Sequence, residues 1–554
     1  MVAGGNHTII LIADWFAMTR IYKESFMSEK KQNFLQGTAM LAMATAIVKV
    51  IGALYKIPLN AIIGKQGFGY YSTAYEIYAV LLMISTAGLP VAMSRMISQS
   101  SALGHNNQVR RIYTTCRTIF LALGISGSLL MTVFCRELAA FQNQPDAWAA
   151  IGCLGPCMLF ICIMSTFRGY FQGRSNMLPT SISQVIEAVV KLVVGIALAI
   201  VFLKATNSVS LAAGGAILGV TASCLVSSVY LWSKFRGSYA QLDTSDDIPE
   251  SFAATAKKLL IIAIPITLGS AGLQILTALE TKIYMGRLLG MMTQAAADTQ
   301  RGIYSMAQTI FNMPCAFITP ITISIIPAIT NHLTLKNTAE ARETEESAVR
   351  VMALISMPCA FGLATLAEPV TALLGGYRGE DLALATSLMA VLGISIIFNA
   401  IVLVTTAIMQ AHGHVNRPVV NMFLGGLVKL AAVFLLTGNP SIGIVGTPIG
   451  TLLCYLVITV LNITSIRTLI ANPPAIVKHA LRPFAAAAIM GAVVYASLLG
   501  LKALGITSRL ILCGAPIVVG VVVYAVLVVV FKCITRSDCL LLPKGAKIAK
   551  LLRL

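Results

Sequence analysis

The chain has 554 residues, of which 57% are hydrophobic and only 11% are charged, and its mean hydropathy is +0.83. Soluble domains carry about 25% charged residues, so this composition leaves too little polar surface to cover a soluble fold of this size. These values argue against a cytosolic enzyme, a secreted disulfide scaffold and a nucleic-acid-binding domain. They predict an all-α integral membrane protein, and the net charge of +19 becomes a question of where the basic residues lie relative to the bilayer.

Fourteen apolar stretches are long enough to cross about 30 Å of hydrocarbon, which takes about 20 helical residues. In chain order the predicted spans are 34–55, 74–96, 112–134, 148–167, 178–203, 209–232, 259–284, 303–329, 349–374, 382–410, 419–436, 442–463, 480–504 and 510–531. The loops between them are short, which predicts a compact bundle of transmembrane helices.

The spans divide the chain into successive units. We predict a cytoplasmic N-terminal tail (1–33), an N-lobe of six spans (34–233), a linker (234–258), a C-lobe of six spans (259–466), two further spans (467–535) and a basic cytoplasmic tail (536–554). The charged loop 331–350 is too short for a separate domain and has the composition of an amphipathic helix on the membrane surface. Residues 1–26 are expected to be an upstream extension, because the sequence from Met27 reads like a natural start.

Most of the 40 lysines and arginines fall in segments on the same side of the membrane as the N-terminus. Basic residues are enriched in the cytoplasmic segments of membrane proteins. The bias and the even number of spans therefore predict that both termini are cytoplasmic. The positive charge is mainly a signal of topology, and it calls for no nucleic-acid partner.

Six spans occur twice. The segment Gly69–Ala74 resembles 302–307, and Gln172 and Lys191 each have a counterpart 238 residues later, at Gln410 and Lys429. A repeat of an even number of spans keeps its orientation in the membrane, so the two lobes are related by an axis along the membrane normal. In transporters of this kind the substrate site lies between the lobes, which alternate in access by rocking.

Basic residues inside spans are costly and are candidate functional residues. Lys49 and Lys56 share one helix face, and Lys191 and Lys429 lie in equivalent spans of the two lobes. Arg95 closes the second span and is either a headgroup ligand or a topology anchor. A cavity lined by these cations suits an anionic substrate such as a pyrophosphate headgroup.

Glu76, Glu187 and Glu280 are the candidates for ion coupling or charge pairing. Glu187 and Lys191 are one helical turn apart, so they form either a self-neutralising pair or part of a substrate site. Lys429 has no acidic residue one turn before it, which favours a polar cavity or an anion as its neighbour.

Pro265 and Pro314 fall in spans expected at the boundary between the lobes and are candidate hinges. Cys153 and Cys157 are one turn apart, but no third ligand stands near them, so no metal site is predicted. No Gly-rich phosphate loop is present to bind ATP, and no cofactor is expected. Transport energy would come from a proton, a monovalent cation or the membrane potential.

Three segments resemble the group of stage V sporulation protein B in the multidrug/oligosaccharidyl-lipid/polysaccharide flippase superfamily. They are Lys30-Lys31-Gln32-Asn33-Phe34-Leu35-Gln36-Gly37, Gly52-Ala53-Leu54-Tyr55-Lys56-Ile57-Pro58-Leu59 and Phe167-Arg168-Gly169-Tyr170-Phe171-Gln172-Gly173. The group is similar to bacterial lipid II flippases. The resemblance implies fourteen spans, two lobes, a central cavity and movement of an undecaprenyl-pyrophosphate-linked saccharide to the outer leaflet.

The resemblance also implies roles for particular residues. Basic residues in the first, second and eighth spans are functional in lipid II flippases, and Lys49, Lys56 and Arg95 match the first two of these. The eighth span departs from the pattern, because its basic residue, Arg301, lies at the predicted outer end and none follows. Glu280 stands where relatives often have an acidic residue.

The main hypothesis is a flippase, not an enzyme, for an anionic polyprenyl-linked lipid in the bacterial cytoplasmic membrane. We expect it to act as a monomer surrounded by membrane lipid. One alternative is a proton- or sodium-coupled multidrug exporter of the same superfamily, which would depend on Glu187 or Glu280. The third hypothesis is a membrane glycosyltransferase, and the short outer loops argue against it.

Overall fold

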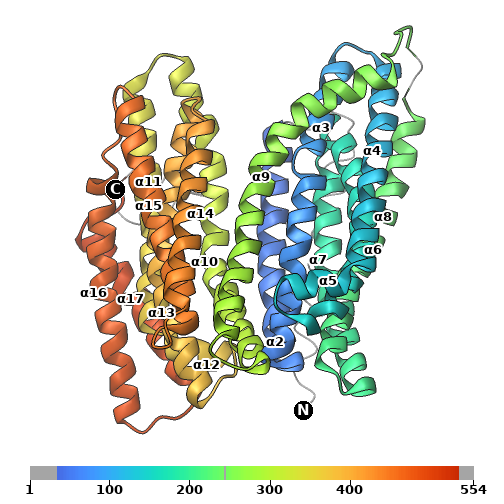
Figure 1. The fold of residues 1–554 in the computed structure, drawn as a ribbon. Helices are drawn as coiled ribbons and strands as arrows, with labels where there is room; N and C mark the ends of the chain where they lie inside the picture. Colours follow the sequence, from blue (N-terminus) through green and yellow to red (C-terminus); the bar gives the residue numbers. More distant parts are fainter. Residues whose placement is uncertain (1–33, 243–244, 536–554) are drawn as a thin grey trace, which may run out of the picture.

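The computed structural model describes residues 34–242 and 245–535, and within them every regular element is a helix (Figure 1). This confirms the all-α membrane fold predicted from composition. Helices satisfy their own backbone hydrogen bonds, which is what a chain needs inside hydrocarbon. The proposed start at Met27 and both predicted tails lie outside the described residues.

The first helix, α2 (Phe34–Thr86), is a hairpin of two spans and not one rod. Its backbone leaves the helical conformation at Gly64, where φ is 71° and ψ is 173°. Tyr55 and Tyr71 lie on opposite sides of this turn with ring centroids 6.0 Å apart. In a straight helix their separation would be about 24 Å. Gly64 therefore reverses the chain, since glycine adopts a positive φ without steric cost.

The remaining helices follow the predicted spans closely. In the first half they are α3 (Leu89–Ala102), α4 (Asn106–Val133), α5 (Cys135–Phe141), α6 (Trp148–Gly173), α7 (Leu178–Thr206) and α8 (Val209–Ala240). In the second half they are α9 (Phe252–Leu289), α10 (Gln294–Thr334), α11 (Thr338–Thr365), α12 (Ala367–Leu374), α13 (Gly379–Ala411), α14 (Asn416–Thr437), α15 (Gly446–Leu469), α16 (Ile476–Ala503) and α17 (Arg509–Val530). Two 3₁₀ turns, η1 (Pro145–Ala147) and η2 (Gly443–Val445), precede α6 and α15.

Twelve segments of the described chain are long and apolar enough to cross a membrane. The first of them, Ile47–Ala102, contains both arms of the α2 hairpin, and α10 adds a further helix of 41 residues. Counted in this way, the described chain has the fourteen membrane-length helices that the sequence predicts. The segment 331–350 forms no separate helix, because α10 continues to Thr334 and α11 runs without a break from Thr338 to Thr365.

The two halves repeat the same packing. In the first half α4 packs on α6, α6 on α8, α7 on α8, and α2 on α7. In the second half α11 packs on α13, α13 on α15, α14 on α15, and α9 on α14. Each half also has a short helix in the same place, α5 after α4 and α12 after α11. The sequence repeat is therefore a repeat of structure, and α16 and α17 lie outside it against α11 and α12.

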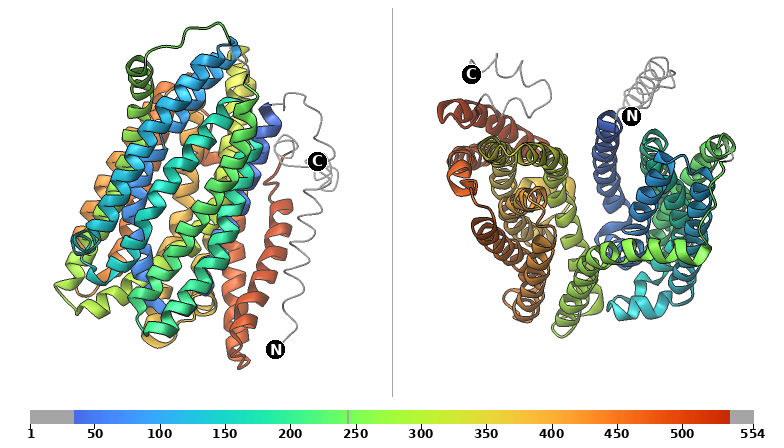
Figure 2. Two further views of the ribbon diagram at one scale, coloured as in Figure 1. Left: turned by 90° about the vertical axis from the view of Figure 1, so that its right-hand side faces the viewer. Right: turned by 90° about the horizontal axis from the view of Figure 1, so that it is seen from above.

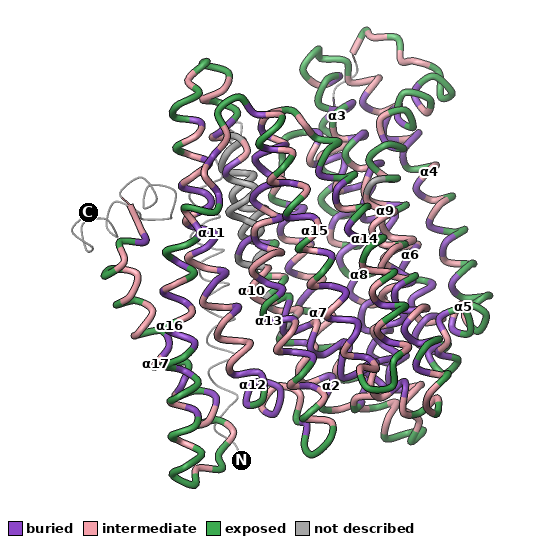
Figure 3. The backbone as a smooth tube through the Cα atoms, turned by 60° about the vertical axis from the view of Figure 1, so that its left-hand side comes forward, coloured by how far each residue is buried: buried purple, intermediate pink, exposed green. Residues whose placement is uncertain are grey.

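The lobes converge at one end of the molecule and diverge toward the other (Figures 1 and 2). We call the end that holds the Gly64 turn the closed end. The helix contacts between the halves are made mainly by α2 against α9 and α10. The beginning of α9 instead lies on the N-lobe, against α3 and α4. Figure 3 shows long exposed stretches on α16 and α17, as expected for helices facing lipid.

Candidate functional site

Four charged side chains meet where α2, α9, α10 and α14 come together. Arg301 Nη2 lies 2.7 Å from Glu76 Oε1, and Lys429 Nζ lies 2.6 Å from Glu280 Oε2. We call these four residues the central cluster. Thr281 Oγ1 donates a hydrogen bond of 2.6 Å to Glu76 Oε2, so α9 holds the carboxylate that α2 supplies. The cluster places two ion pairs inside the membrane region at the lobe boundary.

Arg301 is the residue of the central cluster that spacing in the sequence did not single out. Its side chain is only 1% exposed, although it was predicted at the outer end of its span. The guanidinium donates to Thr73 Oγ1 over 3.2 Å and to the hydroxyl of Tyr284. The early start of α10, at Gln294, carries Arg301 about 10 Å into the helix. A polar first turn before the apolar run is the sequence feature that could have indicated this.

Lys429 receives its partner from another helix. Because no acidic residue lies one turn before Lys429, the sequence predicts a polar cavity or an anion as its neighbour. In the structure the carboxylate of Glu280 on α9 is that neighbour. Glu280 Oε1 is buried and has no hydrogen-bond partner within the described residues. Glu280 also interacts electrostatically with Glu76 and Arg301, so the two pairs form one connected set of charges.

The equivalent place in the N-lobe has a different balance of charge. Lys191 Nζ lies 5.7 Å from the ring centroid of Tyr55, and the Tyr55 hydroxyl donates to the carbonyl oxygen of Ala216 over 3.2 Å. Lys56 interacts electrostatically with Lys191 and with Glu76. Two lysines thus share this region, and Glu76, with which Lys56 interacts, is already paired with Arg301.

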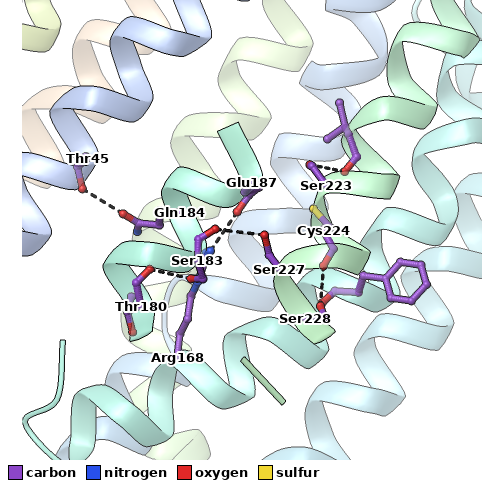
Figure 4. Close-up of polar contacts among 12 residues, drawn as sticks. Thr45, Arg168, Thr180, Ser183, Gln184, Glu187, Ser223, Cys224, Ser227 and Ser228 are labelled. Carbon is purple, nitrogen blue, oxygen red and sulfur yellow. Dashed lines mark hydrogen bonds and ion pairs between the residues drawn. The ribbon is translucent and has the colours of Figure 1, made fainter. Parts of the chain in front are cut away.

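The proposed pair of Glu187 and Lys191 is replaced by a pair between helices (Figure 4). Arg168 of α6 donates to Glu187 Oε2 over 3.0 Å, and its Nε donates to Ser183 Oγ over 3.0 Å. Arg168 belongs to the segment that carries the family resemblance. The side chain of Gln184 lies beside Thr45, whose hydroxyl donates to Gln184 Oε1 over 3.5 Å. This contact joins the first arm of α2 to α7.

The other predicted site residues lie away from the central cluster. Lys49 is exposed on the first arm of α2 and interacts electrostatically with Cys315 of α10. Arg95 is exposed on α3. The helical residues between Glu76 and Arg95 correspond to a rise of about 28 Å. Pro314 is half-buried in α10. The structure therefore brings together Glu76, Glu280 and Lys429, links Lys56 to Glu76 and Lys191 to Lys56, and leaves Lys49 and Arg95 exposed on α2 and α3.

Pro265 lies where α9 crosses the break between α2 and α3. A Cβ atom placed on Gly88, at that break, would overlap the Ala263 carbonyl oxygen and the Thr267 hydroxyl. The glycine thus lets α9 pass directly against the break. The hinge roles of Pro265 and Pro314 remain predictions. Among the described residues no group of three His, Cys, Asp or Glu side chains is placed to hold a metal ion.

Two pseudo-symmetric helical lobes with buried charge pairs at their boundary define the architecture of a multi-pass membrane transporter. A family model described as "Polysaccharide biosynthesis protein" matches residues 34–333, more than half of the chain. The chain therefore belongs to the polysaccharide biosynthesis protein family.

Curated relatives are similar over most of their length. The chain is 25% identical over 524 residues to stage V sporulation protein B of Bacillus subtilis (strain 168), which covers 93% of this chain and 98% of the relative. It is 22% identical over 413 residues to lipid II flippase MurJ of the same organism, covering 72% and 76%. The second of these relatives is named as a flippase, and neither name describes an enzyme.

Solved structures share the fold. A lipid II flippase MurJ in an inward closed conformation matches with a TM-score of 0.66 at 13% identity, covering 89% of this chain and 98% of that one. A multidrug resistance MATE family transporter in an inward-facing conformation has the same TM-score at 13% identity, covering 78% and 97%. An outward-facing MATE structure matches with a TM-score of 0.56. The likeness extends over both lobes.

Proposed function

We propose that this protein is a flippase that moves an undecaprenyl-pyrophosphate-linked saccharide, lipid II or a related cell-wall precursor, across the cytoplasmic membrane by alternating access. The observation that carries the proposal is the unequal charge of the two lobes. Lys429 in the C-lobe is neutralised by Glu280, whereas Lys191 in the N-lobe faces Tyr55 and shares its region with Lys56.

Two ammonium groups close together inside the membrane repel each other and are poorly solvated. An anion between Lys56 and Lys191 removes both penalties, since lysine is a common phosphate ligand. Glu76 cannot serve both lysines while it is held by Arg301 and Thr281. The N-lobe is therefore suited to a multiply charged headgroup such as a pyrophosphate. Lys49 and Arg95, nearer the open end, are assigned to the path by which the headgroup enters.

The proposed topology follows from the distribution of basic residues, with both termini in the cytoplasm. The closed end then faces outward and the headgroup enters from the cytoplasmic side. The polyprenyl tail stays in lipid while the headgroup crosses between the lobes. The protein acts as a monomer without a cofactor, and a proton, a monovalent cation or the membrane potential supplies the energy.

The test is flipping of labelled lipid II by the purified protein in vesicles. We expect the double variant Lys56→Ala/Lys191→Ala to lower the flipping rate by at least about tenfold, because charge-assisted hydrogen bonds worth about 1.5–3 kcal/mol each are lost. Lys204→Ala is the matched control, because Lys204 is exposed in the last turn of α7. Equal rates for the double variant and the control would overturn the assignment of the headgroup site.

The second candidate is an ion-coupled multidrug exporter. The buried Glu280–Lys429 pair favours it, because a carboxylate with an unpartnered oxygen is a reasonable site for a proton or cation. This function predicts increased drug susceptibility when the gene is deleted and loss of export in Glu280→Gln. Lipid II flipping without any drug phenotype would exclude it.

A further inference from the structure

The two copies of one repeated motif touch each other at the closed end. Gly69 begins the first copy, 69–74, and Gly302 begins the second, 302–307. A Cβ atom on Gly69 would lie 3.3 Å from the backbone nitrogen of Gly302 and 3.0 Å from the carbonyl oxygen of Asp298. A Cβ atom on Gly302 would overlap the Lys65 carbonyl oxygen. The backbones of α2 and α10 therefore meet with no room for a side chain.

This contact marks the axis that relates the lobes. Equivalent residues of a two-fold repeat are equally distant from the axis, so equivalent residues in contact must flank it. The second arm of α2 and the first turns of α10 occupy equivalent positions, because α2 packs on α6 as α10 packs on α13. The pseudo-two-fold axis that relates the lobes therefore passes through the Gly69–Gly302 crossing at the closed end.

Polar contacts surround the crossing and join one lobe to the other. Asp298 of α10 accepts hydrogen bonds from Gln144 Nε2 over 2.8 Å and from the Tyr70 hydroxyl over 3.1 Å. Lys65 forms an ion pair with Asp381 of α13, across the same boundary. Asn60 Nδ2 also donates to the Gly375 carbonyl oxygen over 3.2 Å. These groups are polar enough to return to water when they separate.

We propose that the Gly69–Gly302 crossing, with Asp298 as the acceptor that aligns it, is the outer gate across which the lobes part. At the crossing itself two bare backbones form a tight contact without interdigitating side chains, so the glycines can separate and meet again without a side chain in the way. The same movement separates Glu76 from Arg301, which lies one turn beyond Asp298. The gate rests on the alternating access of the proposed function, but its test needs no substrate.

The first experiment measures how far reagents reach past the gate from outside. Ser305→Cys supplies a nearly isosteric thiol one turn deeper than Arg301, at a side chain that is buried in the closed state. In this background Gly302→Ala should increase labelling by an impermeant maleimide about tenfold, as expected for a shift of the open–closed equilibrium. Gly272→Ala on α9, where an added Cβ meets nothing within 4 Å, should leave labelling unchanged. Equal labelling of the two variants would overturn the gate.

A second measurement keeps the proposal testable if Gly302→Ala folds poorly. The pair Lys65→Cys/Asp381→Cys bridges the lobes, whereas Lys502→Cys/Glu368→Cys replaces an ion pair between α16 and α12 at the same end. With a short thiol cross-linker, Asp298→Ala should lower the yield of the first pair several-fold and leave the second unchanged. Equal yields in both backgrounds would exclude Asp298 as the aligning group. If both tests support the gate but the protein does not flip lipid II, the gate proposal is retained and the proposed substrate is refuted.

Discussion

Arg301 of α10 and Glu76 of α2 form an ion pair that joins the two halves of the chain, with 2.7 Å between Nη2 and Oε1. The arginine is almost fully buried and the glutamate is 17% exposed. Thr281 donates a hydrogen bond to Glu76, and Arg301 donates hydrogen bonds to Thr73 and Tyr284, so both side chains of the pair are held by neighbouring helices. The pair therefore holds the lobes together beneath the closed end and compensates two charges that neither lobe could bury alone.

Removing one partner of this pair should be strongly destabilising. We expect Arg301→Ala to lower the free energy of unfolding by about 3–5 kcal/mol, because it leaves the Glu76 carboxylate buried without its counter-charge. Thermal unfolding in detergent measures the effect. Arg174→Ala, at an exposed arginine after α6, is the control and should change stability by less than about 0.5 kcal/mol. Similar melting temperatures for the two variants would show that the Arg301–Glu76 pair contributes little.

The Glu280–Lys429 pair should show coupling in a double-mutant cycle. Glu280→Gln and Lys429→Met each leave one buried charge, whereas the double variant removes both. We therefore expect the double variant to be more stable than the sum of the two single effects by about 0.5–3 kcal/mol. The cycle is measured by thermal unfolding of the four proteins. Additive effects would mean that the two side chains do not interact in the membrane-embedded protein.

Close packing of α7 on α8 depends on Gly219. A Cβ atom there would overlap the backbone of Gly195, so Gly219→Ala should destabilise the N-lobe by about 1–3 kcal/mol. Gly237→Ala on the same helix is the matched control, since nothing lies within 4 Å of the added methyl group. Thermal unfolding compares the variants. Equal stability would refute the close approach of the two helices.

The linker between the lobes is attached to α4 through Asp247, and we expect this attachment to depend on pH. Burial raises the pKa of this carboxyl, but hydrogen bonds from Ser245 and from the backbone N–H groups of Gln108 and Asn107 outweigh it and hold the pKa below the usual 3.8. A lowered pKa in the folded state means that the stabilisation is present above about pH 3.8 and is lost as the pH falls through the lower value.

We therefore expect cleavage within residues 241–251 by an acid-active protease to increase as the pH falls below 3.8. At neutral pH Asp247→Asn should loosen the linker, whereas the neighbouring Asp246→Asn, at an exposed side chain, should not. Limited proteolysis compares the three proteins. Identical cleavage of both variants would mean that the carboxylate does not anchor the linker.

Sequence alone determined the membrane-embedded helices and the repeat of the two lobes. The length of an apolar run is a local property, and a backbone in hydrocarbon has few alternatives to a helix, so the spans follow from composition. The repeat followed from the order of short matches such as Gly69–Ala74 with 302–307, and the packing of the two halves bears it out. The resemblance to flippases of lipid-linked saccharides rested on residues such as those around Arg168, and the family match confirms the family.

Only the tertiary structure decided which charges pair. Spacing in a sequence reports neighbours one turn apart on a single helix, which is why Glu187 was set beside Lys191 and not beside Arg168. Contacts between helices depend on how each helix is rotated about its axis and how deeply it sits, and neither is readable from a uniformly apolar run. Spacing therefore shows no partner for Lys429, which Glu280 provides from another helix, and it sets Arg301 at the edge of a span although its side chain is buried at the lobe boundary.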